Sequence, residues 1–132
     1  IGIVTPYRAQ VRLLKESLKR AGVQADDRVT VGTVHAYQGS EADIILWDLV
    51  ESSSTPIGKL FRGDSGNRLC NVAISRAKGK LVMIGDLNAF RFAPQHEAVQ
   101  CFRNILFGSV GAYKVVRGSE VVNGVAAKLG GR

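Results

Sequence analysis

Cysteine, proline and tryptophan are scarce in this chain of 132 residues, which has two, three and one of them respectively. The two cysteines, Cys70 and Cys101, form no CxxC pair and have no histidine cluster beside them. The sequence therefore predicts neither a metal site nor a disulfide scaffold. A cysteine content of this kind is typical of a reducing compartment, and we expect a cytoplasmic location.

Long apolar runs are also missing. No stretch approaches the roughly 18 to 20 apolar residues that a membrane-spanning helix needs, and the first residues lack the basic-then-apolar layout of a signal peptide. We therefore expect no membrane partner.

With 45% hydrophobic and 22% charged residues, the composition is that of an ordinary globular domain. Folding at this length buries roughly two thirds of the unfolded surface, which is enough for one core.

Basic residues outnumber acidic ones, with 18 Lys and Arg against 11 Asp and Glu, for a net charge of +7. Such a balance favours a polyanionic partner, such as nucleic acid or a nucleotide. A charge that serves only solubility is the alternative.

The chain opens at Ile1 and has its single methionine at Met83, so we expect a piece of a longer protein, truncated at its N-terminal side.

Hydrophobic periodicity divides the chain into alternating elements. Short apolar runs predict strands at 1–5, 28–34, 43–50 and 80–86. Apolar residues at helical spacing predict helices at 6–22, 67–79 and 93–108, all three ending at glycine. A Ser-, Gly- and Pro-rich stretch predicts a surface loop at 51–66, and the remainder predicts a hairpin around "RGSE" with a loose tail.

Strands that alternate with helices predict an α/β domain of three layers, with a mainly parallel sheet between helices. We expect this domain to span residues 1–108 and to be followed by an extension at 109–132. Ligands of such sheets bind at the carboxyl ends of the strands. Three polar clusters fall near these ends or on neighbouring elements, namely "TPYRAQ", residues 33–41 and the helix with Arg76, and we expect them to converge.

No phosphate-binding loop is present, since neither GxxxxGK[ST] nor GxGxxG occurs. Asp48 ends an apolar strand, as does the aspartate that holds magnesium in nucleotide hydrolases. Without a phosphate loop on the same chain, we favour a structural role for Asp48. Asp86 is expected to cap the turn or helix that follows it.

Three segments occur in the order of motifs IV, V and VI of superfamily 1 helicases: "GIVTPYRAQ", "VTVGTVHAYQGSEADIIL" and "NVAISRAKGKLVMIGD". The chain resembles the branch that includes the DNA2-like and nonsense-mediated-decay helicases, over roughly residues 1 to 90. The resemblance implies the second, C-terminal RecA-like domain of an ATP-dependent DNA or RNA helicase, in the cytoplasm or associated with the nucleoid. Its partners would be a single-stranded nucleic acid and the N-terminal RecA-like domain of the parent chain.

In this family, ATP with Mg²⁺ binds between two RecA-like domains, and the first domain supplies the phosphate loop. The isolated fragment is therefore expected to be inactive. The resemblance implies that Arg76 is the catalytic arginine that reaches the γ-phosphate. A permanent planar cation with several donors suits this role, because charge spreads over the phosphoryl oxygens during transfer. The alternative is a cation placed near a helix C-terminus because the helix dipole favours it there.

For residues 33–41 the resemblance implies two ligands. Thr33 and His35 would contact the nucleic-acid backbone, whereas Gln38, Gly39 and Glu41 would face the nucleotide. The sequence departs from the family pattern at His35, where aspartate is usual, although histidine can still donate to a phosphate. Solvation and capping are the alternative roles for Glu41.

Thr5 and Tyr7 are further candidate contacts to nucleic acid, by the same resemblance. A tyrosine ring that stacks on a base contributes about 1 to 3 kcal/mol. Half-buried packing of Tyr7 is the alternative.

Four cations of the following helix lie at steps of four, three and four residues and form one basic stripe: Arg8, Arg12, Lys15 and Lys19. The stripe either guides a phosphate backbone or is a solvated helix face. For the whole chain, the alternative to a motor domain is a non-catalytic nucleic-acid-binding or interaction module with the same fold.

Overall fold

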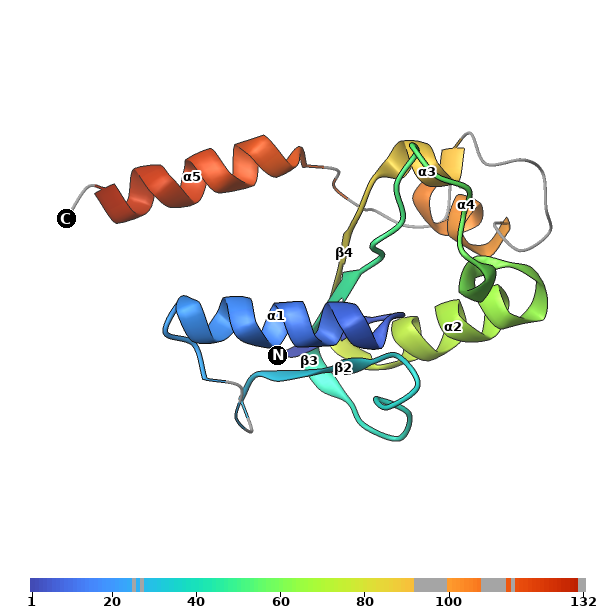
Figure 1. Cartoon of the computed structure of the whole chain (residues 1–132), viewed down its shortest axis with the longest axis horizontal. Coiled ribbons are helices and arrows are strands. Elements are labelled where there is room, and N and C mark those ends of the chain that lie inside the picture. The colour runs from blue at the N-terminus through green and yellow to red at the C-terminus, as the bar shows by residue number, and fades with distance from the viewer. Residues whose placement is uncertain (25, 27, 92–99, 108–113, 115, 131–132) are drawn as a thin grey trace.

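The structure is a computed structural model that describes residues 1–24, 26, 28–91, 100–107, 114 and 116–130. In chain order the elements are β1 (Gly2–Thr5), α1 (Arg8–Arg20), β2 (Thr30–Thr33), β3 (Ala42–Asp48), the short 3-10 helix η1 (Lys59–Phe61), α2 (Gly63–Ser75), β4 (Ala77–Ile84), α3 (Leu87–Arg91), α4 (Gln100–Phe107) and α5 (Gly118–Gly130). Figure 1 shows their arrangement.

The four strands form one parallel sheet in the order β2-β1-β3-β4. This confirms the predicted α/β class. β1 is buried along its whole length, and β3 alternates fully buried Ile45 and Trp47 with half-buried Ile44 and Leu46. β1 is therefore covered on both faces and β3 fully on one face and partly on the other, which explains why their sequences are almost continuously apolar.

Helix α1 packs over β1 and β2 with half-buried Val11, Leu14 and Leu18, although none of its residues is fully buried. The fully buried core lies elsewhere, between the sheet and the segments η1, α2, α3 and α4. Helix α5 extends apart from the sheet (Figure 1). None of the described helices is both long and apolar enough to span a bilayer.

An aromatic cluster closes the end of the core. Phe102 of α4 packs on Trp47, Phe61 and Phe90, with 5.1 Å between ring centroids in each pair. All four rings are fully buried. Four rings from β3, η1, α3 and α4 therefore share one core, so α4 belongs to the same folded unit as the sheet.

Two predicted boundaries are wrong around Arg76. Helix α2 begins at Gly63, inside the expected loop, and β4 begins at Ala77, inside the expected helix. The backbone N–H of Ala42 donates to the Arg76 carbonyl (3.0 Å), and Ala42 pairs with Ala77. Pairing with β3 therefore ends the helix at Ser75, before the glycine that the sequence suggested as its end.

The predicted hairpin around "RGSE" is also wrong, because α5 begins at Gly118. The backbone N–H groups of Glu120 and Val121 both donate to the Arg117 carbonyl, at 3.0 and 3.3 Å, as at a helix start. Glu120 lies in the first turn, where the helix dipole favours an acid. Of the helix predicted at 93–108, the structure describes 100–107 as α4; the domain boundary predicted at 108 lies outside the described residues.

Candidate functional site

The polar clusters separate onto two edges of the sheet. Thr5 pairs with Thr33 at the carboxyl edge, whereas Ala42 pairs with Ala77 at the amino edge, next to Arg76. The expected convergence at the carboxyl edge is therefore wrong. Because β2 and β3 are parallel, the connection between them has to return from one edge to the other. Residues 33–41 form most of this return and reach both edges.

Successive turns fold residues 33–41. The Thr33 hydroxyl accepts a hydrogen bond from the Ala36 N–H (3.1 Å), and the Thr33 carbonyl accepts one from the Tyr37 N–H (3.0 Å). Further along, the N–H of Gln38 donates to the His35 carbonyl at 3.1 Å. These bonds leave the side chains of His35 and Gln38 exposed and Thr33 half-buried.

Tyr37 fixes this segment to the sheet. Its side chain is 8% exposed, and its hydroxyl shares a hydrogen bond with the Thr30 hydroxyl. A Cβ at Gly2 would overlap the Tyr37 hydroxyl, so β1 accommodates the ring only because residue 2 is glycine. Two steps after the tyrosine, Gly39 has φ +87°, and a Cβ added there would meet no atom within 4 Å. The left-handed backbone, and not crowding, thus favours glycine at position 39.

Arg76 caps the C-terminal end of α2 and contacts residues 33–41. One guanidinium nitrogen donates to the Ser40 carbonyl (3.3 Å), and another donates to the Ser75 hydroxyl (2.9 Å). Arg76 is half-buried, and among the described residues no carboxylate forms an ion pair with it. Arg76 thus lies at a helix C-terminus, as the alternative role suggests, and it contacts the segment that carries Glu41. Its catalytic role stays a prediction.

Glu41 lies beside this position and pairs with Lys78 at 3.3 Å, with both side chains more than half exposed. Such a surface pair contributes about 0 to 1 kcal/mol, so another ligand could displace it at little cost. The two residues line a groove of about 610 Å³ at the amino edge. Its lining comprises Ile1, Arg28, Thr30, Tyr37, Ser40, Glu41, Ala42, Asp43 and Lys78.

Thr5 does not reach the surface, contrary to the expectation of a nucleic-acid contact. Its side chain is 0% exposed, and its carbonyl accepts a hydrogen bond from the Val34 N–H (3.0 Å). Within the described part of the chain, its hydroxyl has no hydrogen-bond partner. Thr5 therefore holds the start of residues 33–41 from inside the sheet.

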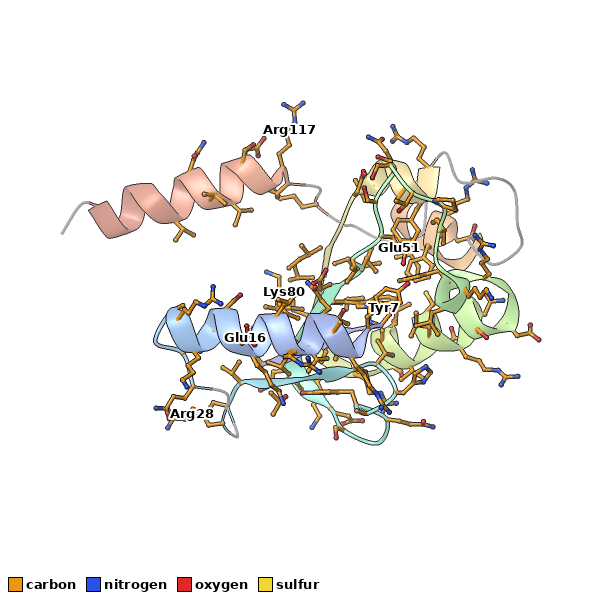
Figure 2. All side chains as sticks on the ribbon, in the orientation of Figure 1. Tyr7, Glu16, Arg28, Glu51, Lys80 and Arg117 are labelled. Carbon is orange, nitrogen blue, oxygen red and sulfur yellow. The ribbon has the colours of Figure 1, made fainter. Side chains whose placement is uncertain are left out.

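Tyr7 is half-buried and its hydroxyl donates to the carboxylate of Glu51 (Figure 2). The other Glu51 oxygen accepts from the Gly58 N–H at 2.8 Å, and Glu51 is only 8% exposed. Burial and the Glu51 carboxylate raise the pKa of the Tyr7 phenol above its ordinary value of 10.0. Of the two roles open to Tyr7, the structure supports packing. Glu51 was not predicted from the sequence, where its only signal was an acid directly after an apolar strand.

A strained turn positions Glu51. Val50 has φ +65°, and the Glu51 N–H donates to the Leu49 carbonyl (2.8 Å), which together define a γ-turn. A β-branched residue in this backbone region is strained, and surrounding contacts have to hold it. Asp48 is one such contact, because it accepts hydrogen bonds from the Val50 N–H (3.1 Å) and the Gln10 amide (2.6 Å). This supports the structural role for Asp48.

The Tyr7–Glu51 hydrogen bond should stabilise the fold. We expect Tyr7→Phe to lower the free energy of unfolding by about 1 to 3 kcal/mol, because it leaves a buried carboxylate with one partner fewer. A double-mutant cycle with Glu51→Gln should give a coupling of similar size, measured by denaturant unfolding with the fluorescence of Trp47. Additive effects of the two substitutions would contradict this interpretation.

The same bond predicts a pH dependence. A phenol pKa that is raised in the folded state stabilises the fold fully below the ordinary value of 10.0 and loses this contribution as pH rises through the folded value. The stability difference between the wild type and Tyr7→Phe should therefore be constant near neutral pH and shrink in the alkaline range above about 10.

Asp86 behaves as the sequence predicted. Its carboxylate accepts a hydrogen bond from the Asn88 N–H (2.9 Å) at the start of α3. It also accepts two from Ser53, which with the Asn88 bond hold the pKa of Asp86 below its ordinary range. Asp86 is thus a cap that also ties the segment after β3 to α3.

Comparison with known sequences assigns the chain to a family. The family described as "AAA domain" matches residues 1–88. The chain is 36% identical to the DNA replication ATP-dependent helicase/nuclease DNA2 of Gallus gallus over 102 residues. The aligned region is 76% of this chain and 10% of that protein. Against the DNA polymerase alpha-associated DNA helicase A of Schizosaccharomyces pombe, the identity is 38% over 96 residues, or 72% of this chain and 13% of the relative.

Helicase sen1 of Schizosaccharomyces pombe is 36% identical over 92 residues, which is 69% of this chain and 5% of that protein. The chain thus spans between 5% and 13% of the length of these three curated relatives. The matched residues coincide with the sheet, α1 and α2 and with the two edges described above. This chain therefore belongs to the AAA domain family of superfamily 1 helicases, in the branch of DNA2 and Sen1.

Proposed function

We propose that this chain is the C-terminal RecA-like motor domain of an ATP-dependent DNA or RNA helicase. The observation that carries the proposal is Arg76: a half-buried cation that donates to the Ser40 carbonyl and, among the described residues, has no acidic partner. An uncompensated guanidinium at an edge of the sheet suits an anionic ligand, and its planar set of donors suits phosphoryl oxygens.

ATP with Mg²⁺ would bind at the amino edge, jointly with an N-terminal RecA-like domain of the parent protein. The residues at this edge fit such a group in part, since they offer a cation, a glycine backbone and an exposed carboxylate but no phosphate loop. When bound, MgATP would supply the phosphoryl group that hydrolysis transfers to water. Arg76 would neutralise charge on that group, while Gln38, Gly39 and Glu41 would line the nucleotide side of the proposed interdomain site.

The nucleic-acid side of the proposed site lies at the carboxyl edge, where Thr33 and His35 begin the segment that ends at Glu41. Support comes from the exposure of His35 and from the course of residues 33–41, which join the two edges. Tyr37 anchors this segment between its two ends. A change in the position of Arg76 on ATP binding would therefore pass through one short connection to the single strand.

The division of the site between two domains can be tested by assaying ATP hydrolysis with and without single-stranded nucleic acid. We expect no hydrolysis by this chain alone, because it has no phosphate loop, and nucleic-acid-stimulated hydrolysis by the full parent protein. A phosphate-loop Lys→Ala variant of the parent is the control for contaminating ATPases. Hydrolysis by this chain alone, or a parent protein without stimulated hydrolysis, would contradict the proposal.

A further inference from the structure

We propose that α1 provides a second nucleic-acid contact, at which a row of cations binds the phosphate backbone of a double helix next to the motor. The row is the basic stripe of Arg8, Arg12, Lys15 and Lys19, and all four residues are exposed. None of them lies in the groove at the amino edge or belongs to residues 33–41. The inference therefore does not depend on the role of Arg76.

The stripe has the geometry of a linear contact. At 3.6 residues per turn, the four positions lie within about 60° of one another around the helix axis and extend over about 16 Å. The helix is held on the sheet by Val11, Leu14 and Leu18, which point in a different direction from the stripe. The four cations are thus presented on a fixed, regular element and not on a loop.

Within the described part of the chain, no acid is paired with the stripe. None of the four cations forms an ion pair there. The only acid of α1, Glu16, pairs instead with Arg20 at 3.6 Å. The first turn of α1 contains no acid and no side-chain cap, and it places Arg8 where the helix dipole disfavours a cation. A bound phosphate would relieve this repulsion as well as neutralise the side chains.

The chemistry of the stripe favours a duplex over a single strand. Single-strand sites combine cations with aromatic rings on which bases stack. Helix α1 contains no aromatic residue, and the nearest one, Tyr7, is held by Glu51. A duplex instead offers one phosphate charge per about 1.7 Å of its axis, so a rigid row of about 16 Å finds several phosphates without base contacts. Binding of the duplex by the stripe should accordingly be independent of the base sequence.

The test compares two variants of this chain that lose the same charge. The stripe variant carries Arg8→Gln, Arg12→Gln, Lys15→Gln and Lys19→Gln, which preserve helix propensity. The control variant carries Lys59→Gln, Arg68→Gln, Lys80→Gln and Lys114→Gln, four exposed cations outside α1. Affinity for a short labelled DNA duplex and for a single strand of equal length is measured without ATP at about 50 and about 200 mM salt. Circular dichroism checks that each variant is folded, and the half-variants Arg8→Gln/Arg12→Gln and Lys15→Gln/Lys19→Gln serve if the full stripe variant unfolds.

We expect the wild type to lose about 100-fold in duplex affinity between these salt concentrations, as four phosphate contacts require. The stripe variant should lose most of this salt dependence, each half-variant about half of it, and the control variant little. Equal losses in the stripe and control variants would overturn the proposal, because net charge alone would then explain binding. It would equally be overturned by a stripe-dependent preference for the single strand, or by no duplex binding at the lower salt concentration.

Discussion

Arg76→Ala is expected to lower nucleic-acid-stimulated ATP hydrolysis by the parent protein by about 10³- to 10⁵-fold, the range that an arginine finger contributes. This corresponds to about 4 to 7 kcal/mol of transition-state stabilisation. The reason is that the guanidinium lies half-buried beside Ser40 with no acid among the described residues paired with it, so in the proposed site its charge would be available to the transferred phosphoryl group. The measurement is steady-state turnover at saturating ATP and nucleic acid.

Two controls make the result specific. Arg76→Lys keeps the charge but loses the planar set of donors, and it should recover only a small part of the activity. Arg68→Ala removes an exposed cation from the same helix and should leave turnover unchanged. Near-normal turnover in Arg76→Ala would refute the arginine-finger assignment, provided that the wild type hydrolyses ATP under the same conditions.

Phe102→Ala is expected to lower the free energy of unfolding of this chain by about 3 to 5 kcal/mol, the usual cost of removing a buried aromatic ring. The ring is 0% exposed and contacts three other rings, so its removal leaves a cavity that rigid neighbours fill poorly. The free energy of unfolding of a native protein is about 5 to 15 kcal/mol, so this loss is a large share of the total. Denaturant unfolding followed by Trp47 fluorescence gives the value.

Phe102→Leu keeps most of the volume and should cost less than Phe102→Ala. Leu13→Ala removes a side chain that is 56% exposed and should change stability by less than about 0.5 kcal/mol. If Phe102→Ala were as mild as Leu13→Ala, α4 could not be part of the core. That result would restrict the folded unit to the residues that match the family.

The sheet could be predicted because each strand is indicated by the pattern of apolar residues within its own short stretch of sequence. Apolar runs separated by an amphipathic helix indicate parallel strands, and the continuous apolarity around Ile45 and Trp47 indicates a strand covered on both faces. The Tyr7–Glu51 bond could not be predicted in this way, since it joins residues 44 positions apart. Nothing in the sequence near either residue indicates that partner.

The arrangement of the candidate site was predictable only in part. The family resemblance assigned residues 33–41 and Arg76 to one nucleotide site, which stays a prediction; the structure shows one contact between them, from Arg76 to the Ser40 carbonyl. The general rule that ligands bind at the carboxyl ends of strands led to the wrong expectation that all three polar clusters meet at that edge. The rule does not consider that the connection between two parallel strands has to return to the amino edge. The expectation for Thr5 overlooked that every residue of β1 is buried, so alternation along this strand leaves no side chain exposed.

The absent side chain at Gly2 has a consequence for how variation in this domain should be interpreted. The aromatic ring of Tyr37 occupies the volume that any larger residue at position 2 would need. Position 2 begins the central strand β1, is far along the chain from Arg76, and is not among the residues proposed to contact a ligand. A substitution there would nevertheless displace Tyr37 and with it residues 33–41, so the proposed coupling of the two ligands could be lost through a change in a strand that has no proposed ligand contact.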